Sequence, residues 1–388
     1  MYKENDDIII NLTVTQKCYA GCKNCINSSL TYDGEGAREA VDLECDPERD
    51  AALIGRIAGK YPGRDIAVCF YGGEPFIEAG RMDRVLSLLN LSPSAGRIKY
   101  MVYSSGDLIA DAVEKYPELI NSIWLYSVSI DGSIKQHEQV RPGTSLGKII
   151  DSLIKLRTVY RGNILVWSTL REEQSLMDCF RQFISMHRHG LADHFFWHWA
   201  DTGQPYDDFK SYSKQYEDEL ELVMKHYTSW LSDGEVLPVS HISELVLYFL
   251  EGKKRGHTAC GVELAQNYDI QGGRIHACAD LPPSLGAYSS ADNIDIPVTI
   301  LQSLVEYKQA LGCRECSMHF YCGGRCPVQA LAGSPDRTGQ ICKLMHIHVN
   351  TVKRHIPYIS KMMARHHISR QQLYDSSAFI TRYTDVIP

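Results

Sequence analysis

Three cysteines near the start of the chain have the spacing of metal or cluster ligands. Cys18, Cys22 and Cys25 lie in the stretch KCYAGCKNC, and Gly21 lets this loop curl so that the three thiols converge. A structural zinc site is usually closed by a fourth protein ligand, but no cysteine or histidine follows within the next ten residues. A catalytic thiol needs one cysteine rather than three. An iron–sulfur cluster with one iron open to another ligand fits directly, and zinc remains the alternative.

Glycine-rich or polar turns follow three further apolar stretches. They are YGGEP at 71–75, YSSG at 103–106 and SIDG at 129–132, and HEQVR follows at 137–141. Each could be an ordinary turn before a helix. Parallel α/β folds, however, carry their chemistry at the carboxyl ends of the strands, which is where the cysteine loop and these turns are expected.

The cysteine loop and the turns together resemble the radical S-adenosylmethionine (SAM) superfamily. By this resemblance, Cys18, Cys22 and Cys25 hold three irons of a 4Fe–4S cluster, and the fourth iron binds the amino and carboxylate groups of SAM. The turns are then expected to contact SAM, with a guanidinium well suited to its carboxylate. The residues implied are Gly72, Gly73, Glu74, Ser104, Ser129 and Arg141.

Two positions in these motifs are interpreted differently. The family usually has an aromatic residue near the adenine just before the third cysteine, and this chain has Asn24 there. Contacts to the adenine are therefore expected to differ in detail. His137 is interpreted as a structural group rather than a catalyst, and Arg141 could also be a surface ion pair.

Seven more cysteines lie in a Gly- and Pro-rich segment that has little apolar sequence of its own. Such a segment needs metal ligation to supply folding free energy. Their pattern resembles the SPASM domain, which carries two auxiliary 4Fe–4S clusters, and zinc ribbons are the alternative. The resemblance assigns Cys313, Cys316, Cys322 and Cys342 to one cluster, and Cys260, Cys278 and Cys326 to the other.

The second of these clusters has three evident thiolates. Family members with a full set have an extra cysteine roughly six residues before the first, near Lys254 in this chain. His257, Asp280, water or the substrate could fill the fourth position. Cys45, Cys69 and Cys179 stand apart and are expected to be buried structural thiols.

Asp280 is the candidate catalytic residue. The sulfatase-maturating members of the family have a catalytic aspartate directly after the second SPASM cysteine. This chain has Ala279 there and Asp280 one residue later. This offset weakens the resemblance to formylglycine-forming enzymes without removing it.

The elements that must position these residues alternate along the first half of the chain. Nearly continuous apolar stretches predict buried parallel strands, with helical patterns such as 46–61 and 146–160 between them. Series of this kind predict a parallel sheet with right-handed crossovers. The strand candidates are 7–15, 66–72, 98–105, 123–130, 164–170 and 194–200.

We therefore expect an α/β fold with a partial (β/α)6 TIM-type barrel over 1–205. A helical bridging region (206–255), a SPASM domain (256–345) and a C-terminal helix and tail (346–388) follow. The net charge of −7 argues against general nucleic-acid binding. No secretory signal and no apolar run of about 18 residues is present, so a cytoplasmic protein without membrane contact is expected.

The resemblance implies an enzyme that cleaves SAM reductively, abstracts a hydrogen from a substrate C–H bond and oxidatively modifies a peptide or protein. Auxiliary clusters would take up an electron, and a ferredoxin or flavodoxin would donate one. The chain starts at its first strand, so a leader-binding domain is expected to be absent or separately encoded. Alternatives are a dehydrogenase or epimerase of a small molecule such as an aminoglycoside, and a non-catalytic electron carrier. HFFWHW (194–199) could line a substrate pocket or form barrel core.

Overall fold

One mixed β-sheet organises the protein. The computed structural model describes residues 2, 4–26, 43–281, 288–289 and 293–388. Within these ranges nine strands pair in the order β6-β5-β4-β3-β2-β1-β7-β8-β9. The strands are β1 (Ile8–Thr15), β2 (Ile66–Gly72), β3 (Ile98–Ser104), β4 (Ile123–Ser129), β5 (Asn163–Leu170), β6 (His194–Trp199), β7 (Asn267–Gln271), β8 (Arg274–His276) and β9 (Tyr288–Ser289).

The first six strands are parallel and neighbour one another in chain order. All six were predicted from the sequence, and each prediction is confirmed to within one residue at either end. The reason is that most of their side chains are buried on both faces, so the strands are almost continuously apolar. Their carboxyl ends meet at one edge, which places the motifs after β1, β2, β3 and β4 side by side.

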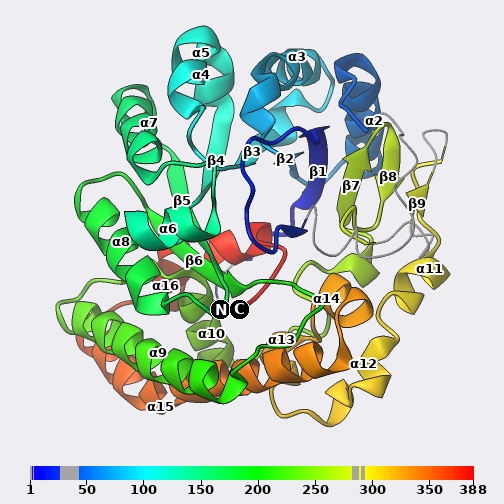
Figure 1. Cartoon of the computed structure of the whole chain (residues 1–388). Coiled ribbons are helices and arrows are strands. Elements are labelled where there is room, and N and C mark those ends of the chain that lie inside the picture. Colours follow the sequence, from blue (N-terminus) through cyan, green and yellow to red (C-terminus); the bar gives the residue numbers. More distant parts are fainter. Residues whose placement is uncertain (1, 3, 27–42, 282–287, 290–292) are drawn as a thin grey trace.

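Helices cover the outer face of this curved sheet, as Figure 1 shows. The two helical patterns predicted from the sequence are confirmed as α2 and α7. Asp46 caps α2 by accepting a hydrogen bond from the backbone N–H of Arg49. The elements of this layer are α2 (Pro47–Lys60), η1 (Pro75–Glu78), α3 (Ala79–Asn90), η2 (Ala95–Arg97), α4 (Ile109–Lys115), α5 (Pro117–Ser122), α6 (Ile134–Val140), α7 (Leu146–Val159) and α8 (Leu176–Arg188).

The cysteine-rich segment extends the same sheet. β7 pairs parallel to β1, and β8 and β9 follow it as antiparallel strands. A chain segment assigned by sequence to 256–345 is thus joined to the first strand by backbone hydrogen bonds. Its short helices follow: η3 (Val262–Leu264), α11 (Val298–Ser303), α12 (Tyr307–Ala310), η5 (Cys313–Glu315), α13 (His319–Cys322) and α14 (Pro327–Ala332).

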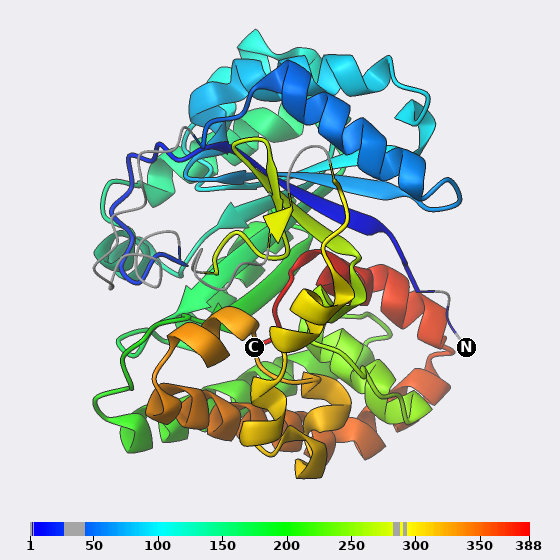
Figure 2. The same cartoon turned by 90° about the vertical axis from the view of Figure 1, so that its right-hand side faces the viewer.

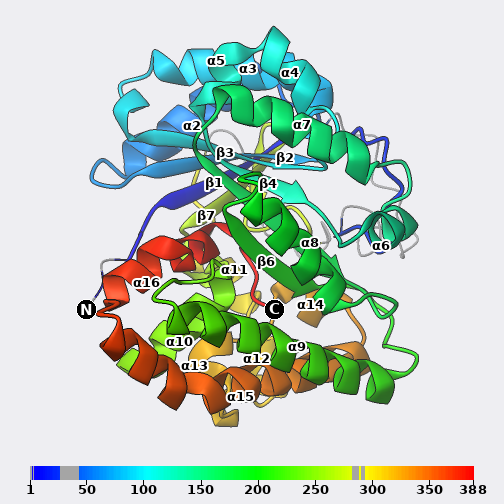
Figure 3. The same ribbon diagram turned by 90° about the vertical axis from the view of Figure 1, so that its left-hand side faces the viewer.

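Long helices pack at the β6 end of the sheet, away from α2 and α3 in Figure 2, where Tyr216 and His241 contact the outward-facing Trp197. The predicted helical region yields α9 (Phe209–Ser232) and α10 (Ser240–Glu251), and α15 (Pro335–Arg365) lies along α9 (Figure 3). The sequence predicted a C-terminal helix in the region 346–388. It begins earlier because Ser334 caps it and Pro335 suits its first turn.

The last residues of the chain lie inside the curve of the sheet. After α16 (Arg370–Ser376), the short helix η6 (Ala378–Tyr383) places Ile380 and Tyr383 against apolar side chains of the inner face, such as Met101 and Phe196. The Tyr383 hydroxyl donates to Asp7 at 2.6 Å and accepts from Lys99 at 2.7 Å. This tail fills one end of the inner face, and the opposite end is left for the motif residues (Figure 1).

None of the helices in the described ranges combines the length and apolar character that crossing a membrane requires.

Candidate functional site

The loop carrying the first three cysteines is anchored to the neighbouring turns by its backbone. Gly21 N–H donates to the Pro142 carbonyl at 2.8 Å, and Lys23 N–H donates to the Val140 carbonyl at 2.9 Å. The Arg171 Nε donates to the Lys23 carbonyl at 2.7 Å. The loop is therefore fixed to the ends of α6 and β5 before any ligand is considered.

Within this loop, the thiols influence one another: burial raises the pKa of Cys18, and Cys22 and Cys25 raise it further. Burial raises the pKa of Cys22 most, and the neighbouring Cys25 raises it further, while Arg141 lowers it. Asn24 has φ of 50°, in the left-handed region that asparagine tolerates better than an aromatic residue does. Tyr19, between the first two cysteines, instead reaches across to a hydrogen bond with Ser105.

The two glycines after β2 permit close contact with the cysteine loop. A Cβ atom on Gly73 would lie 2.2 Å from the Lys17 carbonyl oxygen, and one on Gly72 would lie 2.3 Å from that of Thr15. Gly73 N–H and Glu74 N–H donate to these carbonyls of Thr15 and Lys17 at 2.8 and 2.9 Å. The sequence analysis explained the two glycines by the approach of SAM to the backbone. The structure adds a second reason for glycine here, which is close contact with the Thr15 and Lys17 carbonyls.

Glu74 connects the turns after β2 and β3. Its buried carboxylate accepts hydrogen bonds from Ser104 Oγ at 2.9 Å, Ser105 N–H at 2.7 Å and Ser105 Oγ at 2.6 Å. Burial raises the pKa of Glu74, and these hydrogen bonds oppose the rise. Two motifs predicted as separate SAM contacts, Glu74 and Ser104, thus form one unit.

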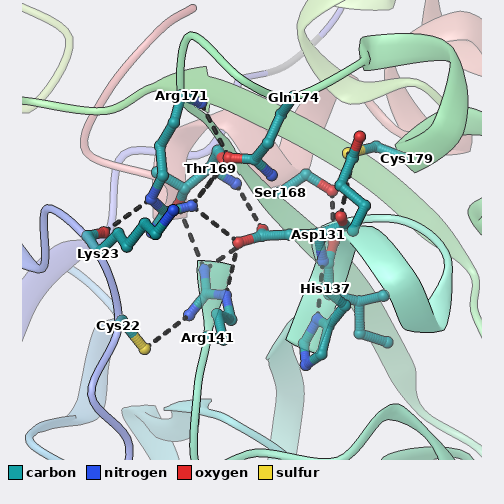
Figure 4. A network of polar contacts seen from close by, with 12 residues as sticks. Cys22, Lys23, Asp131, His137, Arg141, Ser168, Thr169, Arg171, Gln174 and Cys179 are labelled. Carbon is teal, nitrogen blue, oxygen red and sulfur yellow. Dashed lines mark hydrogen bonds and ion pairs between the residues drawn. The ribbon is translucent and has the colours of Figure 1, made fainter. Parts of the chain in front are cut away.

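A buried aspartate organises the turns after β4 and β5 (Figure 4). Asp131 accepts from Arg141 Nε at 2.7 Å, from Arg171 Nη1 at 3.0 Å and from Thr169 N–H at 2.9 Å. Burial alone would raise the pKa of Asp131, but the two guanidinium groups lower it to about 2. Arg141 is predicted to bind the carboxylate of SAM. The Asp131 carboxylate holds its guanidinium so that Nη1 lies 3.9 Å from Cys22 Sγ.

His137 holds the same region together, as the sequence interpretation had it. It is fully buried, and its Nδ1 accepts from Asp131 N–H at 3.1 Å, so that Nε2 carries the proton towards Thr144 Oγ1 at 3.0 Å. Burial lowers the pKa of His137 to about 4. Ser129 ends β4 at the same edge of the sheet and is half-buried.

The other cysteines fall into two groups by the influence of one thiol on another, and the assignment of these groups to two clusters stays a prediction. Burial is the main cause of the raised pKa of Cys278 and of Cys313. Neighbouring thiols raise these pKa values further: Cys326 and Cys260 for Cys278, and Cys322, Cys342 and Cys316 for Cys313. Burial raises the pKa of Cys260 to about 12 and that of Cys313 to about 11. Cys45, Cys69 and Cys179 are buried elsewhere.

The donor chemistry of all three cysteine groups suits iron–sulfur clusters. Thiolate groups of three or four are the usual ligands of 4Fe–4S clusters. No group of three cysteine, histidine or acidic side chains in the described ranges surrounds a point closely enough for a single metal ion. The cysteine donor sets therefore suit 4Fe–4S clusters, and zinc remains the alternative.

An acidic group lies on the inner face between the cysteine groups. Asp269 on β7 accepts from Asn11 Nδ2 at 2.7 Å and from Ala279 N–H at 2.6 Å. Burial and the charge of Asp280 raise the pKa of Asp269 to about 8. Asp385 of the tail accepts from the same Asn11 Nδ2 at 3.4 Å.

Aromatic side chains face the same inner space. The hydroxyl of Tyr71, at the end of β2, is close to Asp280 and Cys25 and has a pKa raised well above its usual value by burial and by these groups. Trp167 lies edge-on to His198 and Tyr103, at 5.3 and 5.2 Å between ring centroids. The HFFWHW stretch is thus mostly core, and His198 is its half-exposed member.

Sequence reasoning did not select several of these residues. Asp131 and Arg171 follow β4 and β5 directly, so the rule that chemistry gathers at strand carboxyl ends would have found them. Asp269 and Asp385 lie in segments without an apolar pattern. Only the sheet pairing of β7 and the fold of the tail bring them together.

The comparisons with known proteins find similarity in the fold only. No family model and no curated protein matches the sequence. Solved structures do match: anSMEcpe with bound AdoMet has a TM-score of 0.64 at 12% identity, covering 91% of this chain and 99% of that one. The complex of anSMEcpe with AdoMet and the Cp18Cys peptide has a TM-score of 0.63 at 12% identity, covering 91% and 98%. SuiB of Streptococcus suis bound to S-adenosylmethionine has a TM-score of 0.53 at 14% identity, covering 85% and 73%.

These neighbours support the resemblance drawn from the motifs. anSMEcpe is an anaerobic sulfatase-maturating radical SAM/SPASM enzyme, and SuiB is a peptide-modifying radical SAM enzyme. The chain has the fold of these proteins. At such low identity the likeness carries no substrate or reaction, because one fold serves many functions.

Proposed function

We propose that the protein is a radical SAM enzyme that oxidatively modifies a residue of a peptide or protein substrate. The observation that carries the proposal is the cysteine loop 18–25, fixed at the carboxyl edge of a parallel sheet by the turns that resemble SAM-binding motifs. A second set of cysteines, gathered in two groups behind the same inner space, supports it. An electron carrier would have no use for the turns at 71–75 and 129–141, which resemble SAM-binding motifs.

The cluster ligands in this proposal are the ten cysteines of the three groups. Cys18, Cys22 and Cys25 hold the cluster that leaves an iron for SAM. When bound, this cofactor pair supplies an electron and then a 5′-deoxyadenosyl radical that removes a hydrogen from the substrate. The auxiliary cluster ligands are Cys260, Cys278, Cys313, Cys316, Cys322, Cys326 and Cys342.

The chain's own residues bind and orient the cosubstrate. Gly72 and Gly73 bring backbone to the cysteine loop, and Glu74, Ser104 and Ser129 present polar atoms at the same edge. Arg141 places a fixed positive charge beside Cys22, because Asp131 holds its Nε and leaves Nη1 directed to the loop. A guanidinium so placed suits the carboxylate of SAM.

The substrate would lie between the first and second cysteine groups. Tyr71 has both Cys25 and Asp280 among its neighbours, so the inner space near it spans the two. Asp280 and Asp269 offer carboxyl groups there for a substrate proton. The complex of anSMEcpe with a peptide supports a peptide substrate. The auxiliary cysteines would hold clusters able to take up one electron, and a ferredoxin or flavodoxin would be the electron donor.

The test is production of 5′-deoxyadenosine. The protein would be reconstituted anaerobically with iron and sulfide, given SAM and a strong reductant, and assayed by mass spectrometry. The C18A/C22A/C25A variant is the control. Product from the wild type alone supports the proposal, and candidate peptides and aminoglycosides can then be screened in the same assay. A wild type that holds about twelve irons yet forms no product would favour the electron-carrier alternative.

A further inference from the structure

Arg325 lies between the two groups of auxiliary cysteines. In the stretch CGGRC it follows Cys322, which belongs to one group, and precedes Cys326, which belongs to the other. Gly323 has φ of 63°, and a Cβ there would overlap the His257 carbonyl oxygen at 1.7 Å. The tight glycine turn therefore directs the arginine into the protein rather than out to solvent.

The guanidinium of Arg325 is buried, with 4% of the residue exposed. Its Nη1 donates to the Pro388 backbone oxygen at 3.2 Å. Its Nε is buried and has no hydrogen-bond acceptor among the described residues. A buried N–H donor of a charged group without an acceptor is costly, so this atom calls for a ligand that accepts hydrogen bonds.

Acidic groups surround this cation on the side of the cysteines. Burial acts to lower the pKa of Arg325, yet thiols and one carboxyl group raise it. These groups are Cys322, Asp201, Cys342 and Cys326, so both cysteine groups contribute. An arginine between two clusters, held by the tail of the chain, can act on both electrostatically.

We propose that the guanidinium of Arg325 raises the reduction potentials of both auxiliary clusters. The inference rests on the proposed function only in requiring that the two cysteine groups hold clusters. Reduction adds negative charge to a cluster, and a fixed buried cation stabilises that form. In a medium with an effective dielectric constant of about 20, one charge near a cluster changes the equilibrium constant for reduction on the order of tenfold.

A matched control is present in Arg337. This arginine is also buried and also acts on Asp201, but its Nη2 donates to the Ala200 carbonyl at 2.7 Å and its guanidinium stacks on Tyr206 at 3.7 Å. The groups that act most on Arg325 include three cysteines; Arg337 instead packs against the barrel end. Its Nε also has no acceptor among the described residues. Arg337→Met therefore removes a buried cation of the same kind that is not among the groups acting most on Cys278, Cys313, Cys326 or Cys342.

The first experiment is a redox titration followed by electron paramagnetic resonance, without substrate. The C18A/C22A/C25A background removes the first cluster and leaves about eight irons in two clusters. Arg325→Met should lower the equilibrium constant for reduction of each cluster about tenfold, which corresponds to a decrease of 59 mV in each one-electron reduction potential. Arg325→Lys, which keeps the charge, should stay near the parent, and Arg337→Met should not shift them.

A second measurement needs no variant that alters cluster assembly. In the same background, labelling with nitrogen-15 arginine should give a nitrogen coupling to a reduced auxiliary cluster in pulsed spectra. Arg337→Met should keep that coupling. Unchanged potentials in an Arg325→Met protein with full iron content overturn the inference. So does an Arg325→Lys protein shifted as far as Arg325→Met. A parent protein that assembles no auxiliary clusters overturns the cluster assignment in the proposed function, and the inference with it.

Discussion

The replacement of Asp131 by asparagine tests the network that fixes the cysteine loop. Asp131 is fully buried and holds two guanidinium groups and one backbone N–H. A carboxyl group whose pKa lies about two units below its usual value contributes about 2–3 kcal/mol to stability at neutral pH. The asparagine side chain would keep the size but not the charge and would leave Arg141 and Arg171 without their counter-ion. We expect a loss of about 2–4 kcal/mol.

The expected loss has a defined pH dependence. The folded-state pKa lies below the unfolded one, so the stabilisation is complete above about pH 4 and disappears as the pH falls towards about 2. The difference between wild type and Asp131→Asn should shrink over this window. At about 2.1 cal/mol/K of unfolding entropy per residue, the loss at pH 7 lowers the midpoint of a 388-residue chain by about 3–5 °C.

Thermal unfolding of the apoprotein, followed by circular dichroism, measures both effects. Asp218→Asn is the control because Asp218 pairs with Lys214 on the exposed face of α9, where solvent screening leaves an ion pair with little effect on stability. If Asp131→Asn unfolds at the midpoint of Asp218→Asn and its difference from wild type does not change between about pH 4 and 2, the network does not hold the loop as argued.

Three further predictions concern the same edge of the sheet. Glu74→Gln should weaken SAM binding at least tenfold, measured by calorimetry on the reconstituted protein, because it disturbs the Ser104–Ser105 turn. The control Glu78→Gln, which affects the ion pair with Lys17, should not weaken it. Equal SAM affinities of the two variants would contradict this prediction. Gly73→Ala should prevent assembly of the first cluster, since its Cβ would overlap the Lys17 carbonyl oxygen. The control Gly63→Ala should still assemble the cluster, because the space around Gly63 is open. Iron counts in a background without the auxiliary cysteines measure both results. His137→Gln should flatten the loss of stability between about pH 6.5 and 4, because the buried neutral ring must be protonated on unfolding there; parallel curves for wild type and variant would refute it.

The strands of the parallel sheet could be predicted because burial on both faces leaves a strong signal. β2, IAVCFYG, is apolar until its last residue, and β6 is aromatic almost throughout. β7, with the sequence NYDIQ, has no such signal. It becomes a strand because β1 offers a free edge for pairing, which is a tertiary cause that a local pattern does not contain.

The candidate site divides in the same way. The cysteine spacing and the turns after β1, β2 and β3 could be read from the sequence, since each is contiguous. The partners that make them a site come from elsewhere: Arg171 holds the Lys23 carbonyl, 148 residues away, and Asn11 holds Asp385, 374 residues away. Such pairs depend on the register of strands and on the path of the tail, and neither is encoded locally.

The first cysteine loop and the later cysteines depend on different parts of the chain. The first loop is held by β2, β5 and the turn after α6, all within the first 205 residues, so its geometry follows from the parallel sheet alone. The second set depends on β7 pairing with β1, on Ala279 N–H bound to Asp269, and on Arg325 bound to Pro388. β1 carries the first loop at its carboxyl end and pairs with β7 along its side. The distance between the first cysteine loop and the later cysteines is therefore set by the register of two short strands, and the tail that packs beneath them holds that register.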